Sequence, residues 1–265
     1  MPELPEVETF RKYIDSTSLH KKISSTEVKN TRILGKVSSA SLKRNLNGTK
    51  LTATKRHGKN LFVELSNHKW IVMHFGMTGF LKYYKNSAEA PGHVRALINF
   101  SNGYHLAYNC TRMLGKIDLV DDISGYIEEK KLGVDPIEGK LSVKDFCKLF
   151  NNKKSVSIKS ALMNQNILAG IGNIYSDEIL FQAGVHPATH VNRLKENDLK
   201  NIYQKMNSVL KKVISVKADH EKLPGRYLIR NRNYDKDCPM CSGKIKKKTI
   251  GGRSSYFCNK HQKKR

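Results

Sequence analysis

The sequence predicts an α+β fold, in which a β-sandwich is followed by a helical region and a small C-terminal module. Three observations predict it: strand-like segments crowd the first half, helical periodicity dominates the second half, and cysteine pairs mark the tail. The 265 residues suit about two domains on the usual length scale. The hydrophobic fraction of 38% is enough for a substantial core.

The first half opens with a short helix and then changes to strands. A helix is predicted from about residue 5 to residue 14, because Pro5 suits a first helical position and Glu6 and Glu8 favour the positive end of the helix dipole. From residue 23 to residue 120, runs rich in β-branched and aromatic residues are separated by Gly and Asn, with no intervening helix expected. Residues 1–130 are therefore predicted to form a domain built around a β-sandwich.

The second half begins after a linker. The Gly- and Pro-containing segment at 131–140 predicts this linker, and helical spacing then runs through residues 141–225. The basic tail at 226–265 is too short to bury a core of its own without a metal or another cross-link. We therefore expect a helical domain that carries a separately stabilised C-terminal module.

The charge of the chain predicts a polyanionic partner. Lys and Arg number 48 against 23 Asp and Glu, a net charge of +25. Nucleic acid is the first expectation, because neutralising phosphates releases counterions. A membrane surface is the alternative, but no apolar run is long enough to span a bilayer. The start MPELPEVETF is acidic and lacks the features of a signal peptide, so an intracellular, cytoplasmic protein is expected.

Two cysteine pairs in the tail predict a metal site. Cys238 and Cys241 form a C-x2-C pair, and Cys258 and His261 form a C-x2-H pair. Thiolates and imidazole in this number suit one tetrahedral zinc ion, and four protein ligands leave no open position. The site is therefore expected to be structural, the alternative being two chance pairs in a basic tail.

The N-terminus carries a candidate nucleophile. Removal of Met1 would leave Pro2 with a free secondary amine, and α-amino groups titrate near about pH 8. Such an amine can attack an electrophilic sugar carbon and form a Schiff base. Glu3 and Glu6 lie close in sequence and could move protons at the reacting sugar. Taken alone, Pro and Glu at this position are more often just an ordinary helix start.

Six segments in order resemble the formamidopyrimidine-DNA glycosylase family. They are MPELPEVET, KRHGKN, HFGMTG, LGVDP, the run from SIKSALMN to FQAGVHP, and CPMC with GGRSSYFCNKH. The resemblance covers nearly the whole chain. It implies a β-sandwich domain, a hinge at 131–140, a helix-two-turn-helix domain at 141–225 and a zinc-finger β-hairpin at 226–265. It also implies damaged double-stranded DNA as the partner and a monomeric, nucleoid-associated enzyme if the source is bacterial.

The resemblance assigns roles to residues of the first domain. Lys59 is implied to be a catalytic lysine and proton donor near the reacting nucleotide. The alternative for this basic run is a phosphate-facing patch, which Lys55 and Arg56 could form. Met77 is implied to be an apolar wedge that fills the space left by a flipped base. Arg112 and Leu114 are implied to face the orphaned base, with Leu114 in place of the family's phenylalanine. His93 matches a DNA-contacting position.

Further roles fall in the second half. The resemblance implies phosphate contacts at Lys154, Lys159 and Asn173, where Asn173 begins a helix after the glycines of GIGN. Arg253 matches an arginine that grips phosphates beside the lesion and assists the second elimination. A merely solvated basic helix pair is the alternative for the two lysines.

The implied reaction is base excision followed by strand cleavage. The Pro2 amine displaces the base, Glu3 assists ring opening, and β- then δ-elimination cut the strand. Leu4 points to the branch that acts on oxidised purines, since the pyrimidine branch has Gly there. The stretch at 215–238 lacks the Gly-Thr-rich loop that caps 8-oxoguanine in bacterial members. Formamidopyrimidines and hydantoins are therefore the expected substrates, ahead of 8-oxoguanine.

Two other classes of protein are compatible with parts of the sequence. A non-catalytic DNA-damage-binding protein could use the same fold, but the intact Pro2, Glu3 and Lys59 argue against it. A zinc-finger RNA-binding protein would explain the charge, but it leaves the PELPE run without a role.

Overall fold

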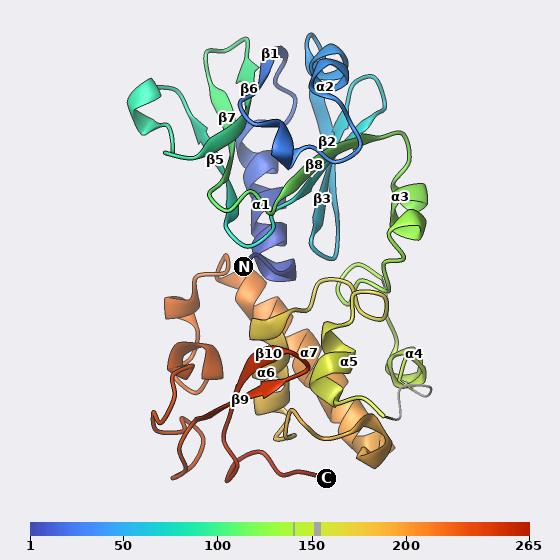
Figure 1. Ribbon diagram of the computed structural model, residues 1–265, viewed down its shortest axis with the longest axis vertical. Helices are drawn as coiled ribbons and strands as arrows, with labels where there is room; N and C mark the ends of the chain where they lie inside the picture. The colour runs from blue at the N-terminus through green and yellow to red at the C-terminus, as the bar shows by residue number, and fades with distance from the viewer. Residues whose placement is uncertain (140, 151–154) are drawn as a thin grey trace. The chain divides into compact units, whose positions relative to one another are not determined.

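The computed structural model describes residues 1–139, 141–150 and 155–265, which divide into two compact units. The first unit contains Met1–Pro2 and Glu6–Lys131, and the second contains Glu3–Pro5 and Leu132–Arg265. Each unit has its own large cluster of buried hydrophobic side chains. The predicted α+β class, with an N-terminal helix and β-sandwich followed by helices and a C-terminal hairpin, is confirmed (Figure 1).

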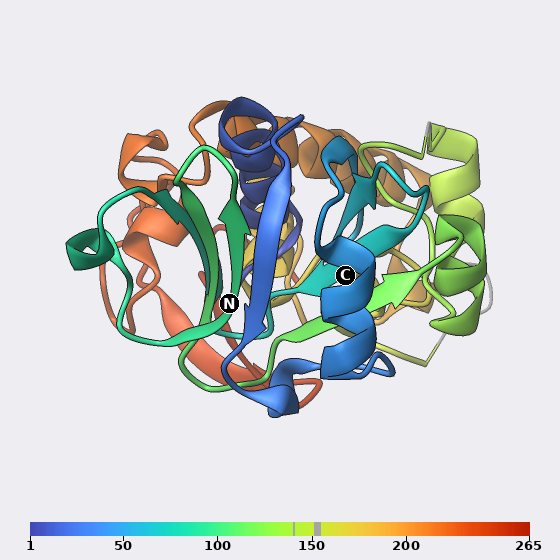
Figure 2. The same cartoon turned by 90° about the horizontal axis from the view of Figure 1, so that it is seen from above.

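The first unit is a sandwich of two four-stranded antiparallel sheets, ordered β1-β6-β7-β5 and β2-β3-β4-β8. The elements in chain order are α1 (Leu4–Thr17), β1 (Ile23–Val28), α2 (Ser39–Leu46), β2 (Leu51–His57), β3 (Asn60–Leu65), β4 (Trp70–His74), β5 (Gly79–Tyr84), β6 (Val94–Phe100), β7 (His105–Cys110), β8 (Lys116–Val120) and α3 (Ile123–Glu129). In the view of Figure 2, the strands of the two sheets lie on either side of α1. Val7 and Ile14 of α1 are fully buried in the same core as the strands.

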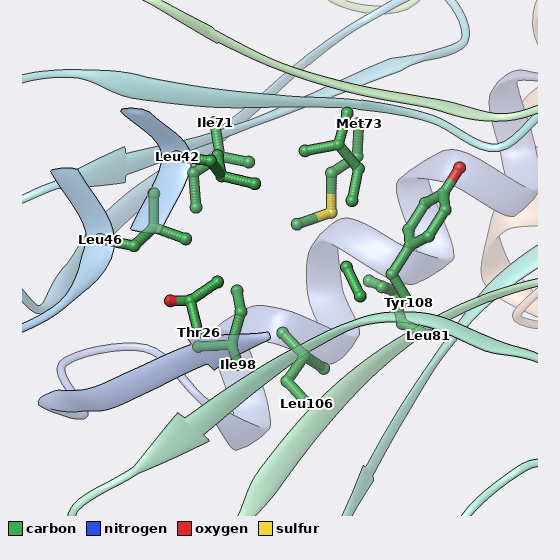
Figure 3. Close-up of a pocket in the computed structure, with 11 residues that line it drawn as sticks. Thr26, Leu42, Leu46, Ile71, Met73, Leu81, Ile98, Leu106 and Tyr108 are labelled. Carbon is green, nitrogen blue, oxygen red and sulfur yellow. The ribbon is translucent and has the colours of Figure 1, made fainter. Parts of the chain in front are cut away.

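The core of the sandwich contains a small cavity of about 10 Å3 (Figure 3). Its walls are aliphatic side chains such as Leu42, Leu46 and Ile98, together with Thr26. Within the described part of the chain, the buried hydroxyl of Thr26 has no hydrogen-bond partner. A cavity of this size is at the lower limit for a single water molecule, so it is a packing defect of the core.

The expectation of strands without an intervening helix is wrong at α2. Ser38 accepts a hydrogen bond from the backbone N–H of Ser41 and so begins the helix. Leu42 and Leu46 lie one turn apart and are buried in the sandwich core. The eight residues of α2 are too few to show a clear helical period, so the signal was lost among the surrounding strands.

The second unit is helical and ends in a β-hairpin. Its longer elements are α4 (Val143–Lys148), α5 (Ile158–Met163), α6 (Asn173–Gln182), α7 (Glu196–Ser215), β9 (Lys246–Ile250) and β10 (Arg253–Phe257). Helix α7 is amphipathic and buries Ile202, Met206 and Val209, whereas α6 is buried from Tyr175 through Phe181. Among the described residues, no helix is both long and apolar enough to cross a membrane.

The start of the second unit is tied to its helices. The backbone N–H of Gly133 donates to the carbonyl of Gln165, and Val134 forms a parallel bridge with Leu168. Asp135 is buried and accepts hydrogen bonds from the backbone N–H groups of Ile137 and Glu138. Residues 132–139 of the Gly- and Pro-containing segment are therefore part of the second unit.

The hairpin turns at two glycines. Gly251 and Gly252 have φ values of +56° and +72°, which a two-residue hairpin turn of this hand requires. A Cβ on Gly251 would come within 2.2 Å of the hydroxyl of Ser160 on α5. The tip of the hairpin therefore lies against α5. At its other end, Cys238, Ile245 and Cys258 pack on Phe181 of α6 in a small separate core.

Candidate functional site

Glu3 caps the N-terminus of α6. Its carboxylate accepts hydrogen bonds from the backbone N–H groups of Gly172 at 2.7 Å, Ile174 at 2.9 Å and Tyr175 at 3.3 Å. Gly172, the residue before the helix, offers no side chain for this purpose, and a Cβ there would lie 2.4 Å from the Glu3 carboxyl carbon. A negative charge at this end also interacts favourably with the helix dipole. Glu3 is therefore fixed to the start of α6 within the second unit.

The other candidate catalytic residues of the N-terminus and the sandwich lie in the first unit. Pro2 and Glu6 are half-buried. Lys59 is also half-buried and lies in the two-residue turn between β2 and β3, where Gly58 has a φ of +58°. Lys59 therefore lies at the end of the β2–β3 hairpin.

A buried ion pair between Arg56 and Glu8 holds the turn that carries Lys59. Arg56 Nε donates to Glu8 Oε2 at 3.1 Å, and Arg56 Nη1 donates to the carbonyl of Gly58 at 3.3 Å. Arg11 binds the same carboxylate at 2.7 Å. The side chain of Arg56 is fully buried, so its expected place in a phosphate-facing patch is wrong. Arg56 instead connects α1 to the turn that carries Lys59.

His74 is close enough to Lys59 for the lysine charge to affect its pKa. Burial, with the positive charge of Lys59 as a smaller cause, lowers the pKa of His74. Its Nδ1 accepts a hydrogen bond from the backbone N–H of Gly76 at 3.3 Å, which requires an unprotonated Nδ1. His74 is therefore a neutral imidazole at pH 7, and only its Nε2 remains as a donor.

The two loops at 75–79 and 110–115 bring the candidate wedge residues together. Arg112 Nη1 lies 3.2 Å from Met77 Sδ, and the backbone N–H of Arg112 donates to Thr78 Oγ1 at 3.1 Å. Gly76 allows this approach, because a Cβ there would lie 2.5 Å from the Leu114 backbone. Met77 is 40% exposed and Leu114 is 50% exposed. Two exposed apolar side chains beside a guanidinium form a surface that is suited to inserting between bases.

The remaining basic candidates differ in accessibility. His93 is exposed. Lys154 lies outside the residues that the structure describes. Lys159 is fully buried, and its ammonium donates to Asp177 at 2.6 Å and to Ser255 Oγ at 2.6 Å. The expected phosphate contact at Lys159 is therefore corrected: its charge is already paired inside the unit.

Asn173 and Arg253 are brought to neighbouring positions. Asn173 begins α6, and its Nδ2 donates to the carbonyl of Ser254 at 3.1 Å. Arg253 immediately precedes Ser254, begins β10 and is exposed. The side-chain oxygen of Asn173 is buried and has no hydrogen-bond partner within the described residues. The start of α6 and the arginine of the hairpin thus belong to one local arrangement.

Three of the four expected metal ligands converge. The sulfurs of Cys238, Cys241 and Cys258 all lie within 4.8 Å of one another. Burial raises the pKa of the Cys238 thiol to about 12, so a bound cation is needed for this sulfur to be a thiolate at neutral pH. His261 is not part of this group, and its Nε2 lies 2.8 Å from the carbonyl of Phe181. Three soft donors in this arrangement suit zinc.

Sequence reasoning missed the residues that hold these groups in place. Glu8, Asp177 and Arg232 each join segments that are far apart in the chain. One signal was available: Asp177 and Glu178 stand directly before the apolar run Ile179–Phe181 of a helical segment. Acidic residues are rarely buried without a partner, so this pair predicted a buried cation elsewhere in the sequence.

A basic two-unit fold with a thiol-bearing hairpin is typical of a DNA-processing enzyme, and comparisons with known proteins specify the class. The profile of the formamidopyrimidine-DNA glycosylase N-terminal domain matches residues 1–117, and that of the formamidopyrimidine-DNA glycosylase H2TH domain matches residues 132–223. A formamidopyrimidine-DNA glycosylase from Pelotomaculum thermopropionicum is 33% identical, with 99% of both chains covered. One from Mycoplasma mobile is 32% identical over the same shares.

Solved structures agree with the sequence comparisons. The Lactococcus lactis formamidopyrimidine-DNA glycosylase, bound non-covalently to DNA that contains an AP site, superimposes with a TM-score of 0.88. It is 28% identical, and the match covers 99% of this chain and 100% of that one. The same enzyme in complex with DNA that contains Fapy-dG gives a TM-score of 0.87 over the same shares of the two chains.

The chain belongs to the formamidopyrimidine-DNA glycosylase family. It is accordingly a bifunctional enzyme, a DNA glycosylase of base-excision repair that is also an AP lyase.

Proposed function

We propose that this enzyme removes oxidised purines from double-stranded DNA and cuts the strand by β,δ-elimination through a Schiff base at Pro2. The observation that carries the proposal is the group formed by Met77, Arg112 and Leu114. It offers exposed apolar side chains to fill a vacated base position and a guanidinium to pair with the orphaned base. The known relatives support the choice of lesion, since one solved neighbour was bound to Fapy-dG-containing DNA.

The chemistry follows from a free amine at Pro2. The Pro2 nitrogen forms a bond to C1′ of the flipped nucleotide while the bond to the base breaks and the base leaves with a proton. The sugar ring opens to the Schiff base, which acidifies the C2′ hydrogen. Loss of that proton expels the 3′ phosphate, and a second elimination expels the 5′ phosphate. Because the amine is returned by hydrolysis, the enzyme turns over without a redox cofactor.

Other side chains have supporting roles in this proposal. Lys59 and Glu6 move protons at the sugar, and the neutral His74 close to Lys59 avoids a second positive charge there. Glu3 protonates the opening sugar ring, for which one of its backbone hydrogen bonds must be exchanged. Arg253 and Asn173 hold phosphates beside the lesion, with further contacts from His93 and Lys154. We infer that the enzyme acts as a monomer.

The metal in this proposal is one structural zinc ion held by Cys238, Cys241, Cys258 and His261. When bound, zinc cross-links the tail and takes no part in catalysis. His261 would use Nδ1, because its Nε2 already faces the Phe181 carbonyl. Zinc-bound histidines commonly donate their other N–H to a carbonyl in this way, which supports the assignment.

The segment after α7 bears on the choice of lesion. Residues 216–231 are folded onto their own unit: Leu223 and Tyr227 are buried, and Asn231 Nδ2 donates to the carbonyls of Gly225 and Tyr227. Tyr175 Oη lies 3.2 Å from His220 Nε2. These contacts, together with the missing Gly-Thr-rich run, support the proposal that the contacts that cap 8-oxoguanine are absent. We therefore propose that lesions that stack poorly are preferred.

Single-turnover excision from matched duplexes tests this proposal. Hydantoins are non-planar and cost less to flip than 8-oxoguanine, which stacks and pairs well. Formamidopyrimidine and hydantoin lesions opposite cytosine should be excised faster than 8-oxoguanine. An 8-oxoguanine rate equal to or above the hydantoin rate would refute the proposed role of the short segment, and no excision of any lesion would refute the function itself.

A further inference from the structure

A buried three-way charge cluster lies where the hairpin meets α5 and α6. Asp177 Oδ1 accepts from Lys159 Nζ at 2.6 Å, and Oδ2 accepts from Arg232 at 2.8 Å. Oδ2 also accepts from the backbone N–H of Tyr256 at 3.1 Å. Lys159 and Asp177 are at most 1% exposed. We call Lys159, Asp177 and Arg232 the hairpin clamp.

Lys159 and Asp177 make several hydrogen bonds within the clamp, whereas the buried Nε of Arg232 has no partner among the described residues. Besides Asp177, the Lys159 ammonium reaches Ser255 Oγ at 2.6 Å and the Ser254 carbonyl at 3.5 Å. Burial lowers the pKa of Lys159, while the Asp177 carboxylate opposes that shift. Removing Asp177 would leave the buried Lys159 ammonium without its counter-charge, whereas Asp177 would keep Arg232 as a partner if Lys159 were removed.

The contacts of the clamp converge on the residues that follow Arg253. The Ser254 carbonyl accepts from Asn173, Lys159 and Arg232, the last at 3.4 Å. Ser255 binds Lys159, and the Tyr256 ring lies under the Arg232 guanidinium with 4.5 Å from Cζ to the ring centroid. Three successive residues of β10 are thus fixed to α5, α6 and the segment before the hairpin. Arg253 directly precedes the first of these three residues, Ser254.

The clamp and the thiol group act on different parts of the hairpin. The sulfurs gather around Cys258, after the end of β10, and pack on Phe181. The clamp instead holds Ser254, Ser255 and Tyr256 within β10, between the turn and Cys258. Metal alone would secure the base of the hairpin and leave the orientation of Arg253 to the clamp.

We propose that Lys159 and Asp177 are positioning residues that set Arg253 in register with Asn173. This inference rests on the proposed function, because the phosphate-binding roles of Arg253 and Asn173 belong to it. In this proposal Lys159 does not contact a phosphate itself. The Lys159–Asp177 pair holds β10 so that Arg253 and Asn173 are already positioned to bind phosphates before DNA binds. This preorganisation lowers the entropic cost of ordering these side chains when DNA binds.

A double-mutant cycle on DNA affinity tests the proposal. The probe is a duplex with a tetrahydrofuran abasic-site analogue, and the variants are Asp177→Asn, Arg253→Ala and the double variant. Asp177→Asn should weaken binding about tenfold in the wild-type background and less than about twofold when Arg253 is already alanine. Zinc should stay at one per chain, and amide hydrogen exchange in residues 253–257 should accelerate. Ser255→Ala, which keeps the ion pair, should give a smaller effect of the same kind.

Asp235→Asn is the matched control, because it removes an exposed carboxylate that pairs with Lys246 on the same hairpin. It should change neither affinity nor exchange. Equal losses from Asp177→Asn in both backgrounds, or unchanged exchange in 253–257, would overturn the positioning role. If Arg253→Ala alone binds as tightly as the wild type, the phosphate-binding role of Arg253 fails instead, and the exchange data show separately whether the clamp orders β10.

Discussion

Three of the buried acidic side chains in the second unit, Glu3, Asp177 and Glu178, are satisfied in three different ways. Glu3 accepts backbone N–H groups at a helix start, and Asp177 is paired with two cations. Glu178 has no cationic partner among the residues that the structure describes: Oε2 accepts from the backbone N–H of Ile229 at 2.7 Å, and Oε1 accepts from Gln182 at 2.7 Å. The difference matters for pH, because the hydrogen bonds to Glu178 do not offset the cost of burying its charge.

Glu178 should make stability depend on pH. Burial raises its pKa from 4.5 to about 7, despite the hydrogen bonds that favour the charged form. The folded state therefore binds this proton more tightly than the unfolded state. The resulting stability is fully present below about pH 4.5 and is lost as pH rises towards 7, by on the order of 3 kcal/mol.

Urea unfolding of the wild type and of Glu178→Gln, between pH 5 and pH 8, measures this effect. Both proteins share the same cysteines, so any pH dependence from metal binding cancels in the difference. The free energy of unfolding of the wild type should fall relative to that of the variant as pH rises to 7 and then level off. A constant difference across the range would mean that Glu178 is charged throughout.

At the scale of the element, the β9–β10 hairpin depends on its ends. The strands are short, and their exposed faces carry Lys246, Lys247 and Lys248, which repel one another. An isolated two-stranded hairpin is marginal in water. Its order here comes from the turn against α5, the clamp on β10 and the thiol group after it.

The fourth zinc ligand can be tested within this element. If His261 completes the site, His261→Ala should lose most of its zinc and open the tail, since structural zinc contributes on the order of 10 kcal/mol to a small module. His261→Cys should retain one zinc per chain and serve as the control. Elemental analysis and the near-UV spectrum of the cobalt-substituted protein would follow both. Full zinc content and unchanged stability in His261→Ala would exclude His261 as a ligand.

At the scale of the whole molecule, the net charge of +25 should govern DNA affinity. If about five phosphates are neutralised, the logarithm of the association constant should fall with a slope of about −4 to −5 against the logarithm of salt concentration. Fluorescence anisotropy between low and physiological salt gives the slope. A nearly flat dependence would mean that most of the lysines face solvent away from the DNA.

The fold class was predictable because β-branched runs and helical spacing occupy separate halves of the chain, and α2 was missed because eight residues carry too little periodicity. The thiol group was predictable from local spacing, since Cys238 and Cys241 are close in sequence. The hairpin clamp was not, because Lys159, Asp177 and Arg232 meet only after α5, α6 and the tail have packed. Local sequence patterns thus predicted the thiol group, whereas the buried ion pairs of the hairpin clamp join residues too far apart in sequence to be predicted.

The central claim is that Pro2 attacks the sugar, and borohydride trapping on lesion-containing DNA tests it most directly. Borohydride reduces a Schiff base to a permanent protein–DNA adduct, so the wild type should be trapped at the lesion strand. Pro2→Gly should lose trapping and base excision but keep its affinity for a tetrahydrofuran duplex within about threefold, because the Met77, Arg112 and Arg253 contacts remain. Wild-type-like trapping in Pro2→Gly, or no trapping in the wild type, would contradict the claim.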